Sequence, residues 1–233
     1  DIRISKDILK QLSESYRKIR NTARYILGNL FDFDPNENMV SLEEIQPIDK
    51  WALYKLDELN KKVREAYDNF EFHLVYHAVR NFCVVDMSNF YLDILKDRLY
   101  VEKADSKSRR AAQTTIYIIL NAMTRLLSPI LAYTSEEIWS EMPHSNKEVA
   151  SNVILNQMPE LINIEVDDKF IGYWDCIHNL REDVQKALEL ARSEKIIGSS
   201  LDAKVTLYAN GEAYEFIKSS LEELKTIFIV SDI

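Results

Sequence analysis

Residues 5–30 read SKDILKQLSESYRKIRNTARYILGNL. Apolar side chains recur in this stretch at steps of three and four residues, which is the period of one face of an α-helix. Ser5 is a residue type that caps helix N-termini, and the DFDP segment that follows Phe31 is typical of a helix stop. The stretch therefore predicts one long amphipathic helix.

The same period continues through the next hundred residues. It predicts further helices over residues 47–68, from 72 to about 100, over 107–127 and over 129–142, with Pro47 and Ser106 at two of the starts. Short connections between helices of this length indicate antiparallel neighbours. We therefore expect a mainly α fold whose first part, residues 1–145, is an antiparallel helical bundle.

The pattern changes after residue 145. Residues 146–169 are polar without a sustained period, so we expect a linker that crosses the bundle surface. Residues 170–233 predict a small α-β-α-β appendage: a helix over 170–195 that ends near Gly198, an alternating strand over 203–209, a helix over 212–221 and an apolar strand over 227–230.

Composition narrows the class of protein. Hydrophobic residues make up 46% and charged residues 29%, which is typical of a soluble globular protein. No apolar run approaches the roughly 20 residues that span a bilayer, and no signal peptide opens the sequence. With two distant cysteines, the chain is expected in the cytoplasm. A start at Asp1, already inside a helical pattern, suggests part of a longer polypeptide.

Positive charge is concentrated in two stretches. The formal net charge is −9, yet residues 1–30 and residues 96–125 each carry a net +4, which leaves −17 for the remainder. The distribution of charge, and not its total, is what attracts a polyanion. The sequence therefore permits a nucleic-acid partner.

The first basic stretch places a row of polar side chains on one helix face. Arg17, Arg20, Asn21 and Arg24 share this face, and a seven-residue step along a helix is about 10 Å. Arginines in such a row can follow a phosphate backbone, while an asparagine can read a base edge. An ordinary solvated helix face is the alternative.

The second basic stretch contains Arg109 and Arg110 at the start of a predicted helix. The helix dipole disfavours cations at that end. The placement hints at an external anion, so we include this pair as a second, weaker candidate RNA-binding patch.

Catalytic and metal-binding motifs are missing. The four glycines are scattered, so no phosphate-cradling loop exists, and neither a G-x-S-x-G elbow nor a C-x-x-C pair occurs. His73 and His77 share a helix face, but a zinc site needs at least a third ligand. We therefore predict no catalytic residue and no metal ligand.

Four segments carry a resemblance to a known family. They are YRKIRNTARYILGNLFDFDP (16–35), NFYLDILKDRLY (89–100), SRRAAQTTIYIILNAMTRLLSPILAYTSEEIW (108–139) and ARSEKIIGSSLDAKV (191–205). In this order they resemble the C-terminal, anticodon-binding region of bacterial-type isoleucyl-tRNA synthetases, which are class I aminoacyl-tRNA synthetases.

The resemblance implies a function. The bundle would bind the anticodon stem-loop of tRNA(Ile) and support ATP-dependent aminoacylation by a catalytic domain of the same polypeptide. The two ATP-handling signatures of class I enzymes and the cysteine-rich zinc module are absent from these residues. The fragment itself is therefore expected to be no enzyme, to hold neither ATP nor zinc, and to act as part of a monomeric isoleucine–tRNA ligase.

Three alternatives remain. The pattern around SPILAYTSEEIW (128–139) is shared with valine-, leucine- and methionine-specific synthetases, whereas residues 16–35 point more narrowly to isoleucine. A helical protein-interaction module is a second alternative, and salt-dependent tRNA binding would separate it from an RNA binder. An independent small enzyme is the weakest, because no catalytic constellation is present.

Overall fold

The computed structural model describes residues 4–233, without the side chain of Glu212. The first three residues of the predicted bundle, including the basic Arg3, therefore lie outside the described part. The chain divides into two compact units, one ending at Glu165 and the other covering Val166–Ile233.

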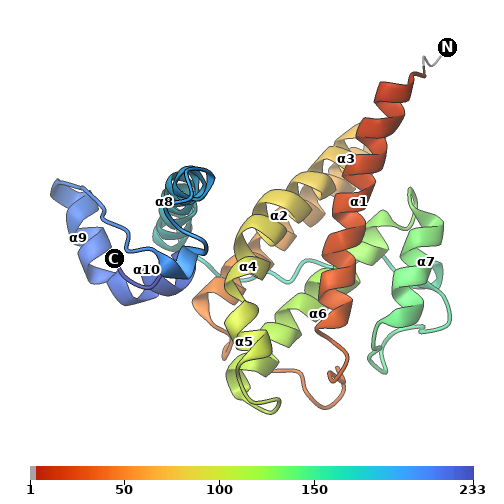
Figure 1. The fold of residues 1–233 in the computed structure, drawn as a ribbon. Coiled ribbons are helices and arrows are strands. Elements are labelled where there is room, and N and C mark those ends of the chain that lie inside the picture. The colour runs from red at the N-terminus through yellow and green to blue at the C-terminus, as the bar shows by residue number, and fades with distance from the viewer. Residues whose placement is uncertain (1–3) are drawn as a thin grey trace. The chain divides into compact units, whose positions relative to one another are not determined.

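The first unit is a bundle of helices (Figure 1). Helix α3 continues into a π-helix, η1, and then into two short helices, and α1 packs against α3, η1, α6 and α7. The mainly α prediction is confirmed. The helices are α1 (Lys6–Gly28), α2 (Pro47–Asp68), α3 (Phe72–Asn81), η1 (Phe82–Tyr91), α4 (Leu92–Ile94), α5 (Lys96–Tyr100), α6 (Lys107–Leu127), α7 (Ala132–Glu141) and the short 3-10 helix η2 (Val153–Leu155).

Most helix starts of the bundle lie where the sequence predicts them. The Ser5 side chain accepts a hydrogen bond from the backbone N–H of Ile8, Ser106 caps α6 in the same way, and Pro47 opens α2. The last start differs: residues 128–131 form a turn, and α7 begins at Ala132.

The π-helix η1 was not predicted. The three- and four-residue periodicity indicated an ordinary helix from residue 72 to about 100, but the backbone is π-wound from Phe82 to Tyr91. Its buried face includes Met87 and Phe90, and the Phe90 ring lies 4.7 Å from the ring of Trp51 on α2. π-helical turns are rare and often mark functional sites.

The segment after α7 follows the surface of α2. Its backbone N–H groups at Ile162 and Asn163 donate to the Asp57 carboxylate over 2.8 and 2.7 Å, and Asn60 Nδ2 donates to the Pro159 carbonyl over 2.8 Å. Asp57 and Asn60 are both buried. We call residues 143–165 the strap; these bonds hold it to the bundle.

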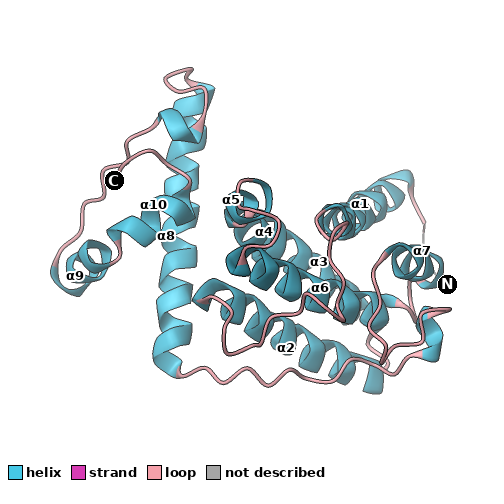
Figure 2. Cartoon of the chain, turned by 90° about the horizontal axis from the view of Figure 1, so that it is seen from below, coloured by secondary structure: helices cyan, strands magenta, loops and turns pink. Residues whose placement is uncertain are grey.

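The second unit is helical, and the predicted α-β-α-β appendage is not formed in it. It contains α8 (Asp168–Ser193), η3 (Ser200–Asp202), α9 (Gly211–Ser219) and α10 (Leu221–Phe228). Figure 2 draws no strand in the described chain. Pairing there is limited to an isolated parallel bridge between Lys204 and Asp232.

The physical reason is that a short apolar run fits a buried strand and a buried helix equally well. Leu224, Ile227 and Phe228 are buried at helical spacing, and the chain leaves α10 at Ile229, which has a left-handed φ of 56°. Val205 donates to the Asp232 carbonyl over 2.9 Å but extends no ladder from it. The strand predictions over 203–209 and 227–230 were therefore wrong.

A buried arginine joins two helices of this unit. Arg181 of α8 is 2% exposed, and its Nε donates to the Ile227 carbonyl at the end of α10 over 2.7 Å. The last carbonyls of a helix lack internal partners and carry partial negative charge. Arg181 therefore satisfies the C-terminal end of α10 while Trp174 and Ile177 fill the core around it.

Candidate nucleic-acid interface

The exposed face of α1 brings four predicted site residues together. Arg17, Arg20, Asn21 and Arg24 are all exposed, whereas Ile19 lies on the opposite side at 1% exposure. At 3.6 residues per turn the four side chains fall within an arc of about 100°. We call these four residues the α1 row.

No side chain of the α1 row forms an ion pair or a hydrogen bond within residues 4–233. Two other arginines of the same unit behave differently: Arg98 binds Asp49 over 2.8 Å, and Arg109 is also paired with a carboxylate. The cations of the row therefore keep their full hydrogen-bonding capacity for a partner, and arginine suits bidentate contacts with phosphate.

Three hydrogen bonds fix the direction in which the α1 row faces. Each joins a half-buried or buried side chain of α1 to a different neighbouring element, so that rotation of the helix about its axis would break all three. They join Tyr16 Oη to Thr134 Oγ1 of α7 (3.0 Å), Thr22 Oγ1 to Ser88 Oγ of η1 (3.2 Å) and Tyr25 Oη to the Leu92 carbonyl of α4 (3.3 Å).

Arg109 does not reach the surface. It is 5% exposed, and its guanidinium donates to both carboxylate oxygens of Asp32 over 2.7 and 2.9 Å. It also donates to the Leu99 and Ala104 carbonyls over 3.2 and 3.0 Å. With its hydrogen bonds used internally, Arg109 is not available to RNA, and we remove it from the candidate set.

Arg110 is engaged in the same place. Its side chain is 17% exposed and donates to the Asp32 carbonyl over 2.7 Å and to Gln113 Oε1 over 2.8 Å. The helix dipole disfavours two cations at a helix start, and here Asp32 of the same chain supplies the nearby anion. The sequence shows Asp32 shortly after the first helix. No local pattern, however, indicated that this carboxylate would contact Arg109 and Arg110.

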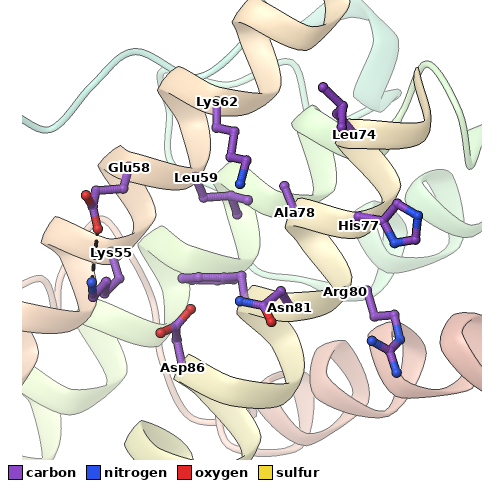
Figure 3. A pocket seen from close by; sticks show the side chains of 11 residues that line it. Lys55, Glu58, Leu59, Lys62, Leu74, His77, Ala78, Arg80, Asn81 and Asp86 are labelled. Carbon is purple, nitrogen blue, oxygen red and sulfur yellow. Dashed lines mark hydrogen bonds and ion pairs between the residues drawn. The ribbon is translucent and has the colours of Figure 1, made fainter. Parts of the chain in front are cut away.

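A hollow of about 620 Å³ lies between α2 and the α3–η1 segment (Figure 3). Lys55, Lys62, Arg80 and the exposed His77 line it, together with the Asp86 carboxylate of η1. Burial raises the pKa of Asp86 to about 6, against the lowering effect of Lys55. No local sequence pattern indicated this hollow, because its residues come from helices that only the fold brings together.

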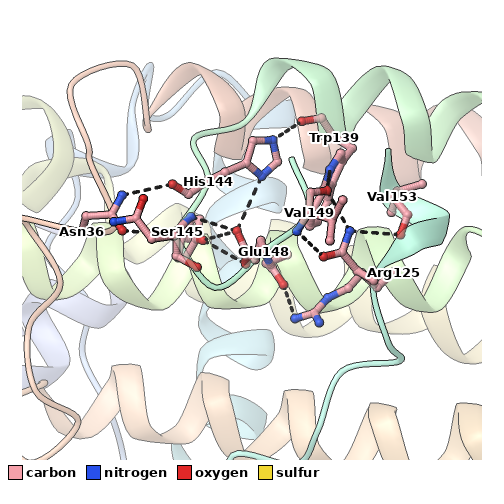
Figure 4. Close-up of polar contacts among 12 residues, drawn as sticks. Asn36, Arg125, Trp139, His144, Ser145, Glu148, Val149 and Val153 are labelled. Atoms are coloured by element: carbon pink, nitrogen blue, oxygen red, sulfur yellow. Dashed lines mark hydrogen bonds and ion pairs between the residues drawn. The ribbon is translucent and has the colours of Figure 1, made fainter. Parts of the chain in front are cut away.

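A second polar cluster holds the strap near α6 and α7 (Figure 4). Glu148 accepts hydrogen bonds from Tyr117 Oη over 3.0 Å, from the Ser145 N–H over 2.9 Å and from Asn121 Nδ2. His144 lies beside it, with Nε2 2.9 Å from the Trp139 carbonyl. The carboxylate is saturated with donors, so the cluster serves to fix the strap.

Neither histidine of the predicted incomplete pair is buried: His73 and His77 are exposed on α3. Within the described residues, no group of three or more His, Cys, Asp or Glu side chains could hold a metal ion. The same residues contain no helix that is both long and apolar enough to cross a membrane.

Comparison with known families gives one match to a family model. Residues 49–207 match the anticodon-binding domain of tRNA ligases. The matched range covers α2 to α7, the strap and α8, so α1 and its row lie before it.

Similar proteins extend over the whole chain. It is 53% identical to an isoleucine–tRNA ligase of Caldanaerobacter subterraneus subsp. tengcongensis, 52% identical to one of Desulforamulus reducens and 49% identical to one of Bacillus mycoides. Each alignment covers 100% of this chain and 25% of the relative. The chain thus spans about a quarter of the length of the curated relatives it matches. The resemblance found in the four quoted segments is confirmed.

Proposed function

The chain belongs to the anticodon-binding domain family of tRNA ligases, and from that premise we propose that it binds the anticodon stem-loop of tRNA(Ile) through the α1 row. The choice of isoleucine follows the names of relatives that are about half identical over all of its residues. We assign aminoacylation to a catalytic domain elsewhere in the same polypeptide, and we expect the sites for ATP and zinc in parts of that polypeptide outside these residues.

One observation carries the proposal: the α1 row is exposed, unpaired within the described residues and held in a fixed direction. Three arginines in line can neutralise successive phosphates, and Asn21 between them offers both a donor and an acceptor to a base edge. Elsewhere in the first unit, Arg98 and Arg109 are used to bind carboxylates. The family match supports RNA as the partner. The unpaired arginines of the α1 row support this face of α1 as the site where the RNA binds.

The other properties of the whole protein follow as proposals. We assign it to the cytoplasm, as a translation enzyme that acts as a monomer. The fragment is proposed to form no isoleucyl-adenylate by itself, since the ATP-handling signatures lie outside these residues. Isoleucine-dependent pyrophosphate exchange by the purified fragment would contradict this.

The test replaces the cations of the row in the full-length protein. Arg17→Ala, Arg20→Ala and Arg24→Ala are each expected to weaken tRNA(Ile) binding. Each should also reduce the salt slope, d log K/d log[salt], by about one unit if the arginine binds one phosphate. The affinity is measured by filter binding at several salt concentrations. Lys61→Ala, an exposed lysine of α2 outside the row, is the matched control and is expected to leave the slope unchanged.

The outcomes separate the candidate functions. If all three arginine variants bind tRNA(Ile) as the wild type does across salt, the row is a solvated helix face and the site assignment is wrong. If the wild-type protein binds tRNA without salt dependence, the helical protein-interaction alternative gains support, because phosphate contacts release counterions. Asn21→Ala is expected to change discrimination between tRNAs by about 1–3 kcal/mol if Asn21 contacts a base.

A further inference from the structure

A small hollow opens beside the C-terminal half of the α1 row. It has a volume of about 330 Å³, at the lower end of the roughly 300–1,000 Å³ of pockets that hold small molecules. Five of its lining residues come from α1 and its C-cap, and the sixth comes from α5. They are Asn21, Arg24, Tyr25, Gly28, Asn29 and Tyr100.

Gly28 forms part of this hollow without a structural need for glycine. It lies inside the last turn of α1, it has no positive φ, and a Cβ added to it would meet no atom within 4 Å. Alanine at such a helical position would make the helix more stable than glycine does. Helix stability thus favours a side chain at residue 28, and the glycine leaves the hollow open.

The aromatic wall of the hollow is held in place. Tyr100 is 62% exposed, and its hydroxyl accepts a hydrogen bond from Asn29 Nδ2 over 3.3 Å. Asn29 is 6% exposed and also donates to the Tyr25 carbonyl over 2.8 Å. Tyr25 in turn donates its hydroxyl to the Leu92 carbonyl over 3.3 Å. A fixed, exposed aromatic ring offers a surface on which a nucleobase can stack.

Two further polar side chains of the hollow are the last two members of the α1 row. Asn21 and Arg24 are exposed, and their side chains form no hydrogen bond or ion pair in the described part of the chain. An amide recognises the edge of a base, and a guanidinium binds a phosphate. Around one small hollow, the ring therefore suits the face of a base, the amide suits its edge and the cation suits its phosphate.

We propose that this hollow receives one unstacked nucleobase of a tRNA loop, with its phosphate on Arg24 and its base between Tyr100 and the open surface at Gly28. The proposal rests on the proposed function, because the α1 row brings the RNA to this place. The base contributes affinity through stacking and through the Asn21 amide, whereas the rest of the row contributes through charge. Stacking and charge respond differently to salt, and this difference makes the proposal testable.

The main experiment fills the hollow in the full-length protein. Gly28→Leu places a branched side chain in the open space, whereas Gly28→Ala adds one methyl group and is the matched control. Gly28→Leu is expected to weaken tRNA(Ile) binding about 5- to 150-fold, the range for loss of one stacked base, with an unchanged salt slope. Gly28→Ala is expected to weaken binding less than Gly28→Leu does and to melt at a higher temperature than the wild type.

Tyr100→Ala provides a second route to the same result. Tyr100 is largely exposed, so its removal is compatible with folding, and it should reduce affinity to a similar extent. If Gly28→Leu unfolds, as seen by circular dichroism, this variant decides the question. Wild-type affinity in Tyr100→Ala, or in folded Gly28→Leu, would overturn the proposal.

A fluorescent base locates the nucleotide. 2-Aminopurine is placed at one loop position at a time in an anticodon stem-loop, and its fluorescence is followed on binding. We expect one position to change with the wild-type protein and with Gly28→Ala but not with Gly28→Leu. An identical response at every position in all three proteins would contradict the proposal. Absence of any tRNA binding by the wild type would instead remove the proposed function on which it rests.

Discussion

Arg109 of α6 and Asp32, which follows α1, form a two-point ion pair: Nη1 lies 2.7 Å from Oδ2 and Nη2 lies 2.9 Å from Oδ1. The Arg109 side chain is 6% exposed and that of Asp32 is 23% exposed. Gln113 adds a third donor to the same carboxylate over 2.8 Å. The pair therefore joins the end of α1 to the start of α6 and contributes to the placement of the α1 row.

The first prediction concerns the contribution of the Arg109–Asp32 ion pair to the stability of the fold. Arg109→Ala removes two of the three donors to the Asp32 carboxylate and leaves two backbone carbonyls without their Arg109 donor, so it should lower the free energy of unfolding by about 3 kcal/mol, at the lower end of the range for breaking a buried pair. The matched control is Lys107→Ala in the same helical turn, whose exposed ion pair with Glu44 should contribute at most about 1 kcal/mol. Urea denaturation of both variants measures the difference, and equal losses would contradict the prediction.

The second prediction concerns pH. The hydrogen bond from Arg109 holds the pKa of Asp32 below its usual 3.8, against the raising effect of burial. A lowered folded-state pKa means that the stabilisation is complete above pH 3.8 and is lost as the pH falls through the folded value. The destabilisation caused by Asp32→Asn should therefore be largest at neutral pH and should shrink below pH 3.8. Urea titrations at a series of pH values, with no such convergence, would exclude this linkage.

The sequence predicted α1 well because this helix buries only one face, unlike α6, which is buried on nearly all sides. Local residue spacing alone predicted the apolar face of α1, its Ser5 cap and its exposed row. The π-helical backbone of η1 could not be predicted from the sequence. A π-helix differs from an α-helix in its backbone hydrogen-bonding pattern and not in its composition. The α10 segment failed for another reason: four consecutive apolar residues, 227–230, are compatible with a strand until Leu224 is known to share their core.

For the candidate site, too, the features set by local spacing could be predicted and those set by distant contacts could not. The exposure of Arg17 and Arg24 follows from helical geometry alone, so it could be predicted. The fate of Arg109 depends on Asp32, which lies 77 residues earlier in the chain, and no local pattern specifies such a contact. Charge at a helix start indicated that an anion was needed but did not say whether the anion belonged to a ligand or to the protein.

The third prediction concerns the hollow in Figure 3. Because burial raises the pKa of Asp86 to about 6, the folded state favours its protonated form, and ionisation removes stability as the pH rises from about 4 through 6. Asp86→Asn, which mimics the protonated form, should unfold like the wild type at pH 3.5 and be more stable by about 3 kcal/mol at pH 8. Glu58→Gln, at an exposed carboxylate of the same hollow, should show no comparable rise. A pH-independent difference for Asp86→Asn would be inconsistent with this assignment.

The fourth prediction concerns the strap and the cluster in Figure 4. Glu148 is 12% exposed at its side chain and accepts from Tyr117, Asn121 and the Ser145 backbone. Glu148→Ala removes the acceptor and leaves these donors unpaired in a partly buried place, which should cost about 2–4 kcal/mol of stability. Glu148→Gln keeps one acceptor oxygen and the side-chain volume, so it should cost less than half as much.

Glu148→Ala should increase local opening of the strap before it affects unfolding of the whole bundle. Amide hydrogen exchange is expected to accelerate first around residues 143–150 in Glu148→Ala, while amides in the middle of α6 stay protected, because the strap is tied to the bundle at separate points. The contacts of Asp57 with Ile162 and Asn163 lie at its far end and should keep their protection. If exchange instead accelerates equally in α6 and in the strap, Glu148 supports the whole bundle and the strap is not a separable element. A normal exchange pattern with unchanged stability would mean that water replaces the carboxylate without cost.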